Sequence, residues 1–98
     1  MTIQQIKEGP KLTIVIDGRL DTTSAPQLEA VVKEQLTGID DLTFDLEKMT
    51  YISSAGLRVL LSAQKMMNRQ GAMRLTHVNE MNQEIFNVTG FSDIMTIV

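Results

Sequence analysis

Two adjacent serines, Ser53 and Ser54, are the residues of this chain whose type and position best suit chemistry. They open a run with helical spacing, which predicts a helix from about Ser54 to Arg69. The first N–H groups of a helix have no partner within it, and the helix dipole favours negative charge there. A serine hydroxyl at this point can cap the helix, or it can accept a phosphoryl group from a kinase.

The serine pair alone predicts only a cap, because serine is among the favoured residues at this position. The surrounding residues carry more information. A buried strand is expected from Leu42 to Leu46, a short loop follows it, and Ala55 and Gly56 come directly after the serines. Small residues at a helix start allow another molecule to approach the backbone closely. The pattern therefore favours a binding surface around the two hydroxyls.

The segment from Asp45 to Leu61 resembles the signature of the STAS domain, and more narrowly that of the single-domain anti-sigma factor antagonists of bacteria. The resemblance extends to Gly18-Arg19-Leu20-Asp21, which is similar to the early Gly-x-Leu-Asp turn of the family. It also includes Thr89-Gly90-Phe91, which is similar to the late Thr/Ser-Gly-hydrophobic turn. The resemblance thus covers nearly the whole chain.

The family pattern around the switch is commonly Asp-Ser-Ser/Thr-Gly, with the first serine phosphorylated. Counted back from Gly56, that serine falls on Ser54. This chain departs from the pattern on both sides, because Ser53 replaces the aspartate and Ala55 replaces the second hydroxyl residue. The resemblance implies phosphorylation of Ser54, with Ser53 as the second choice.

The resemblance implies a binding module rather than an enzyme. Unphosphorylated, it would bind an anti-sigma factor that is also a serine kinase, and so release the sigma factor. The kinase would phosphorylate Ser54 with ATP and end the complex, and a serine phosphatase would restore it. Asp21 would contact the kinase by resemblance, although capping the next helix explains it equally well. The alternative is a constitutive accessory subunit of a membrane lipid-transport ABC assembly, which some similar stand-alone domains are.

The expected helix 54–69 has an apolar arc about twice as wide as the usual stripe of a surface helix. Its narrow polar side holds Arg58, Ser62, Lys65 and Arg69. The wide arc either packs on a sheet and a second helix, or it forms part of a partner-binding patch beside the serines. The predicted partner-binding residues are Asp21, Ser53, Ser54, Ala55, Gly56, Val59, Ala63 and Met66. Burial of the last three would exclude the patch.

The pattern of apolar periods and turn residues predicts the order β-β-α-β-α-β-α-β. Strands that alternate with helices favour an α/β fold with a single mixed, mostly parallel sheet, and the first hairpin supplies an antiparallel edge. The expected strands are 2–7, 11–17, 42–46, 73–78 and 94–98, and the expected helices are 25–36, 54–69 and 80–88. Gly18 is expected to end the second strand. The chain stops at Val98 without the final helix of many relatives, so a surface is expected to be open there.

Length and composition narrow the function classes. The 98 residues suit one domain, 1–98, and the absence of cysteine excludes disulfides and thiol catalysis. A net charge of −3 disfavours nucleic acid as a partner. No signal pattern and no apolar run of membrane-spanning length occurs, which predicts a cytoplasmic protein without direct membrane insertion. The single histidine, His77, has no ligand cluster in the sequence, so neither a metal site, a cofactor nor a nucleophile–base pair is expected.

Overall fold

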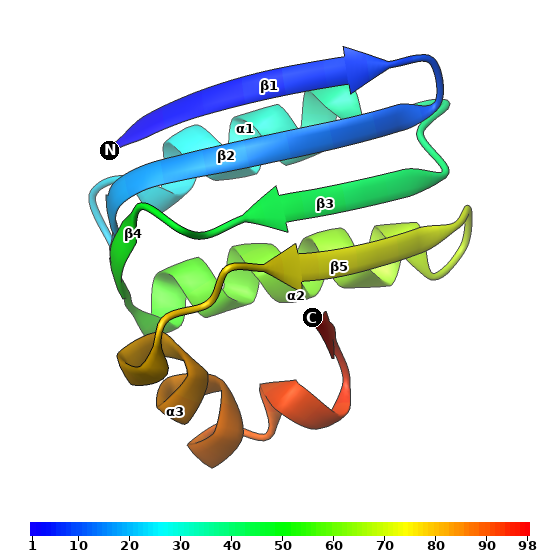
Figure 1. Ribbon diagram of the computed structural model, residues 1–98. Coiled ribbons are helices and arrows are strands. Elements are labelled where there is room, and N and C mark those ends of the chain that lie inside the picture. Colours follow the sequence, from blue (N-terminus) through cyan, green and yellow to red (C-terminus); the bar gives the residue numbers. More distant parts are fainter.

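Six strands form one mixed sheet, and three helices accompany it (Figure 1). The computed structural model describes all residues, 1–98. The elements are β1 (Thr2–Glu8), β2 (Lys11–Leu20), α1 (Ala25–Gln35), β3 (Asp41–Asp45), β4 (Met49–Ile52), α2 (Ser54–Met67), β5 (Ala72–Thr76), α3 (Glu80–Val88) and β6 (Thr96–Ile97). The sheet runs in the order β1-β2-β3-β5-β6, and β4 pairs with the end of β2. Only the β1–β2 hairpin is antiparallel, which confirms the predicted mixed, mostly parallel sheet.

The alternation of β2 explains which face of the sheet is buried. Leu12, Ile14 and Ile16 point to one face and are almost fully buried, whereas Thr13 and Val15 point to the other and are half-exposed. The helices α1 and α2 lie side by side on the buried face (Figure 1). This arrangement places one hydrophobic core between the sheet and the helix pair.

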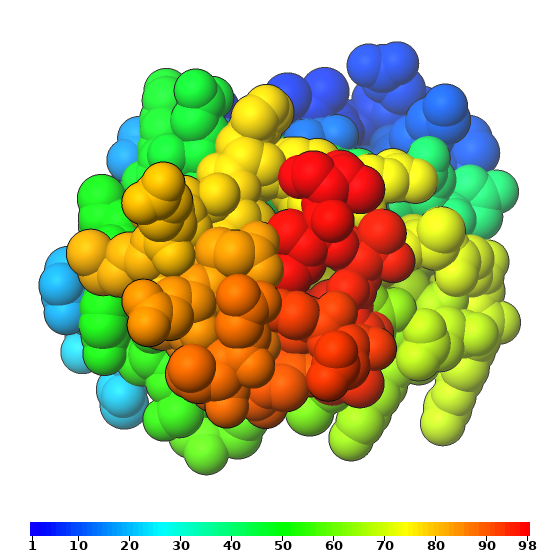
Figure 2. Space-filling model, turned by 60° about the horizontal axis from the view of Figure 1, so that its bottom comes forward, coloured from blue at the N-terminus to red at the C-terminus, as the bar shows by residue number.

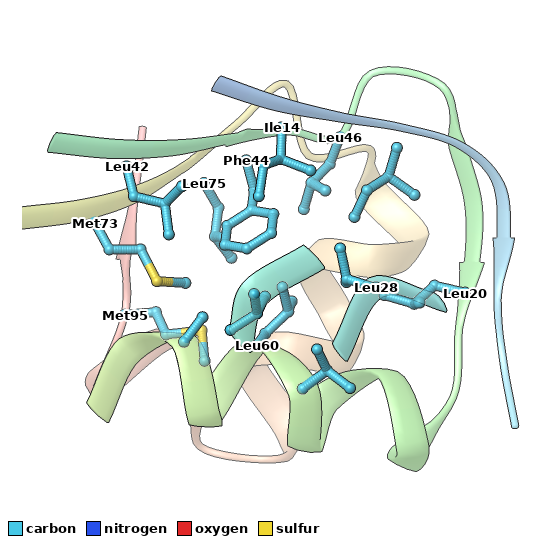
Figure 3. Close-up of a cluster of buried hydrophobic side chains, with 14 of the residues drawn as sticks. Ile14, Leu20, Leu28, Leu42, Phe44, Leu46, Leu60, Met73, Leu75 and Met95 are labelled. Carbon is cyan, nitrogen blue, oxygen red and sulfur yellow. The ribbon is translucent and has the colours of Figure 1, made fainter. Parts of the chain in front are cut away.

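The core is built from strand and helix side chains that interdigitate (Figure 3). Leu28 of α1 and Leu60 of α2 approach Ile14 and Phe44 of the sheet, and none of these four side chains is exposed. Complete burial of one such side chain contributes about 1.5–3 kcal/mol. The core therefore fixes α2 on the sheet, and with it the position of the helix start.

The second strand is longer than its sequence predicts. Gly18 was expected to end it, but β2 continues to Leu20 through a bulge at Gly18, where the backbone has a φ of +103°. Glycine adopts such a φ at little cost, so the residue bends the strand instead of ending it. The extension pairs with β4, a strand that is absent from the order expected from the sequence.

The C-terminal segment also differs from its prediction. The expected strand 94–98 is reduced to β6, and a short 3₁₀ helix at Phe91–Asp93 precedes it. Figure 2 shows this segment packed beside α3 on one side of the molecule. Ile94 and Val98 of this segment are exposed apolar side chains, and so is Val88 at the end of α3.

The helix α3 is attached to β4 by two asparagines. Asn79 caps the helix by accepting the N–H of Asn82 at 2.8 Å, and both side-chain amides donate to the carbonyl oxygen of Met49, at 3.3 and 3.1 Å. Asn82 is completely buried, so its hydrogen bond lies out of contact with water. None of the three helices is long and apolar enough to cross a membrane.

Candidate functional site

The two serines occupy different positions at the start of α2. Ser53 is extended, with φ −96° and ψ 174°, and its hydroxyl accepts the backbone N–H of Gly56 at 3.4 Å. It is therefore the N-cap residue. Ser54 is the first helical residue, and its side chain is exposed. Of the two serines, Ser54 is therefore the more exposed.

Gly56 allows the helix to begin directly against the ends of two strands. A Cβ atom at this position would lie 2.7 Å from Leu20 Cγ and 2.9 Å from Ile52 Cγ1, closer than carbon atoms pack. Leu20 ends β2 and Ile52 ends β4, and both side chains belong to the core. This close approach sets the distance between the first turn of α2 and the strand ends. It thereby also sets the position at which Ser54 meets the solvent.

A groove of about 310 Å³ lies beside these residues, between α1 and α2. Ala55, Arg58 and Ser62 line it from α2, and Pro26 and Glu29 line it from α1. Its walls are therefore partly apolar and carry one charge of each sign. A partner that covered the start of α2 would reach this groove directly.

The solvent-facing side of α2 carries a row of cations behind Ser54. The exposed residues Ser54, Arg58, Ser62 and Lys65 follow one another at spacings of three or four, which places them on one side of the helix. The exposed Arg69 follows two residues after the helix ends at Met67. None of the three cations takes part in one of the four ion pairs of the protein. We call this row the basic stripe.

The predicted apolar patch beside the serines is wrong for Val59 and Ala63. Val59 is 6% exposed and Ala63 is completely buried, and both belong to the core, while Met66 is half-buried against it. The reason is that α2 contacts the sheet on one side and α1 on another, so the wide apolar arc is used within the domain. Of this set, only Val59 lines the groove.

Asp21 stabilises the loop before α1. Its carboxylate accepts the backbone N–H groups of Thr23 and Ser24 and the Ser24 hydroxyl, each at 3.1 Å, and Arg19 lies 3.6 Å away. The hydrogen bond from the Ser24 backbone, followed by the other donors and the Arg19 charge, holds the pKa of Asp21 below its ordinary value of 3.8. Arg19 also stacks on the ring of Tyr51, 4.3 Å from its centre. Asp21 thus fixes the loop before α1 and does not cap the helix, whose N-cap residue is Ser24, so the expected capping role is wrong. A kinase contact stays a prediction.

His77 has two acidic neighbours, Asp45 and Glu47, that are distant from it in the sequence. Asp45 and Glu47 bring carboxylate oxygens close to its ring, contrary to the expectation of no ligand cluster. The parallel pairing of β3 with β5 creates this proximity, since Asp45 is the register partner of Thr76. Only knowledge of the strand order could have revealed it.

Comparisons with known proteins agree with this architecture. Residues 2–98 match the STAS domain family. BtrV, a candidate anti-sigma factor antagonist of Bordetella bronchiseptica, is 34% identical over 99 residues, which cover 99% of this chain and 85% of BtrV. The anti-sigma-B factor antagonist of Bacillus subtilis is 32% identical over 91 residues, which cover 88% of this chain and 80% of that protein.

A solved structure shares the fold at lower identity. The Bacillus cell fate determinant SpoIIAA in its phosphorylated form superposes with a TM-score of 0.78 at 16% identity, over 99% of this chain and 91% of that one. The family match extends over nearly the whole length, and it includes the strand–helix junction that carries the two serines. The chain belongs to the STAS domain family.

Proposed function

We propose that this protein is an anti-sigma factor antagonist, and that it binds its partner through the start of α2. The main support for this proposal is the exposed Ser54, which lies at the first position of α2, while Ser53 already caps the helix. Relatives named as anti-sigma factor antagonists support the partner class. The partner is an anti-sigma factor, and its binding by this protein frees the sigma factor.

Phosphorylation of Ser54 turns the interaction off. A phosphoserine adds about −1.5 to −2 charges at neutral pH, and the helix N-terminus stabilises them by roughly 0.3–1 kcal/mol. The fold therefore survives the modification. The partner, in contrast, has to desolvate a dianion at the centre of its contact, which costs several kcal/mol. A loss of about 3 kcal/mol weakens binding more than a hundredfold.

The basic stripe gives the switch a second effect. Arg58 follows Ser54 by four positions, and an acidic group placed four residues before a cation is the favourable direction on a helix. Phosphoserine at position 54 would engage Arg58 and withdraw it from the groove it lines. A partner that had paired an acidic side chain with Arg58 would lose that contact as well.

The proposed partner is also the kinase: it binds ATP and transfers the γ-phosphoryl group to the Ser54 hydroxyl, with release of ADP. A separate serine phosphatase removes the phosphate. The kinase can reach the hydroxyl of Ser54 without unfolding the helix, because that side chain is exposed. Ser53 is a poorer acceptor, since its hydroxyl already serves as the cap. Peptide mapping of the protein isolated from its own cells should find phosphate on Ser54.

Binding measurements with the anti-sigma factor of the same organism test the proposal. Calorimetry should give wild-type affinity for Ser54→Ala and at least about a hundredfold weaker binding for Ser54→Asp. Gln4→Glu is the matched control, because it adds a negative charge at an exposed residue of β1 that does not line the groove. Equal affinity for Ser54→Asp and wild type would refute the switch. Co-purification of an ABC-type ATPase instead would favour the constitutive-subunit alternative.

A further inference from the structure

Three potential metal ligands converge at the edge of the sheet where β3 and β5 end. Asp45 is the last residue of β3, Glu47 lies in the loop that follows, and His77 comes directly after β5. His77 Nδ1 lies 3.0 Å from Asp45 Oδ1. The three ligand atoms all lie within 4.8 Å of one another. The residues belong to two segments that are 32 positions apart.

The backbone around this cluster is well fixed. The Leu46 N–H donates to the Thr76 carbonyl at 2.9 Å, which joins the loop after β3 to the end of β5. Asp45 Oδ1 also accepts the Glu47 N–H, at 3.2 Å. His77 has a φ of +57°, and it is the only residue other than glycine in the left-handed region. The chain therefore holds an imidazole beside two carboxylates in a conformation that most residues avoid.

The charges in the cluster are poorly compensated. The Asp45 carboxylate has His77 as its only ion-pair partner, and Glu47 takes part in none of the four ion pairs. Two neighbouring carboxylates repel each other unless a cation lies between them. His77 supplies at most one positive charge, whereas a divalent ion supplies two.

We propose that Asp45, Glu47 and His77 bind a divalent cation of the late first transition series, and that Zn²⁺ is the ion they suit best. One imidazole nitrogen and two carboxylate oxygens are a ligand set that zinc accepts, with water in the remaining position. Ligand atoms on a tetrahedral zinc ion lie about 3.4 Å apart, from bonds of about 2.0–2.1 Å. The 3.0 Å between His77 Nδ1 and Asp45 Oδ1 needs only a small opening to reach that separation. Glu47 is exposed and can close the remaining gap by rotation of its side chain.

The site should discriminate between metals. Mg²⁺ and Ca²⁺ prefer six or more oxygen ligands, and this cluster offers two carboxylates and one nitrogen. A bound zinc ion would cross-link the end of β5 to the β3–β4 loop. That loop leads to β4, and β4 leads to Ser53, so the ion would restrict the segment on which α2 begins.

Zinc titration of the protein without an affinity tag tests this inference. His77 is the only histidine, so its ring resonances in an NMR spectrum need no assignment. We expect Zn²⁺ to shift or broaden these resonances and Mg²⁺ to leave them unchanged. Calorimetry on the same samples gives the affinity, and Asp45→Asn and Glu47→Gln should each weaken zinc binding at least about tenfold.

The decisive variant is His77→Gly. Glycine takes the left-handed backbone without strain, so loss of zinc binding cannot be attributed to a damaged fold, which circular dichroism would verify. Glu84→Gln is the matched control, because Glu84 is an exposed carboxylate of α3 outside the cluster, and its loss should leave the affinity unchanged. Ring resonances that do not respond to excess zinc would overturn the proposal. So would His77→Gly protein that binds zinc as tightly as wild type.

Discussion

Replacement of Gly56 with alanine should destabilise the protein, although alanine is the better helix former. The new methyl group would lie 2.7 Å from Leu20 Cγ and 2.9 Å from Ile52 Cγ1. Leu20 is completely buried and Ile52 is 2% exposed, so neither side chain can move into solvent. Either α2 has to shift away from the sheet or the two side chains have to leave their preferred rotamers.

Two opposing contributions set the size of the effect. Insertion of a methyl group into a well-packed core costs about 1–3 kcal/mol. Alanine recovers at most about 1 kcal/mol relative to glycine within a helix, and less in the first turn, where Gly56 lies. The net loss should be about 1–2 kcal/mol. For a domain of this size it corresponds to a melting temperature lower by about 4–16 °C.

Urea denaturation and a thermal melt would measure this change. Ser62→Ala is the matched control, because it makes a similar substitution on the exposed side of the same helix. It should stabilise the protein by a few tenths of a kcal/mol, roughly 0.5 at most, through helix propensity alone. If Gly56→Ala raised the urea midpoint as Ser62→Ala does, the close packing of α2 on the strand ends would be refuted.

Three further predictions concern individual side chains. Ser53→Ala should lower the free energy of unfolding by about 0.5–1 kcal/mol through loss of the cap, whereas Ser54→Ala should stay within about 0.5 kcal/mol of wild type; equal losses in urea denaturation would contradict the assignment. The pKa of Asp21 lies below 3.8 in the folded state, which is its ordinary value in the unfolded chain. Its ionised carboxylate therefore stabilises the fold fully above pH 3.8, and this contribution is lost as the pH falls through the lower, folded-state pKa. Asp21→Asn should therefore lose less stability than wild type on acidification from about pH 5 to pH 2, measured by urea midpoints. Asn82→Ala removes one of the two amides that donate to the Met49 carbonyl, and because Asn79 still donates to that oxygen, urea denaturation should show a loss of about 0.5–1.5 kcal/mol.

Local sequence signals were sufficient for the helices. The helix predicted for 80–88 has those bounds in the structure, because Asn79 caps its start. The helix that begins at Ser54 was placed correctly at its start and two residues too long at its end. Caps and turn glycines act within a few residues of their own position, so a single sequence contains what is needed to find them.

Features that depend on contacts between distant segments were not predicted. The strand β4 has four residues, and it exists because β2 continues past Gly18 to pair with it. Val59 and Ala63 are buried instead of forming a patch, because α2 packs against both the sheet and α1, and the sequence does not show how many neighbours a helix has. His77 was considered isolated, since the carboxylates beside it come from the neighbouring strand and its loop. In each case the missing information was which distant segments lie against one another.

The central position of β2 also has a consequence for the way in which the protein folds. Its ten residues pair with β1 across a two-residue turn, with β3 at a distance of about thirty residues, and with β4 farther along the chain. The hairpin can form within about 1–10 μs, whereas the parallel pairs first require closure of loops that contain α1. We therefore expect refolding to be slow for a chain of this length, with docking of β3 on a preformed hairpin as the rate-limiting event. Substitutions at the β2–β3 contact would then slow folding, and those in α3 would mainly accelerate unfolding.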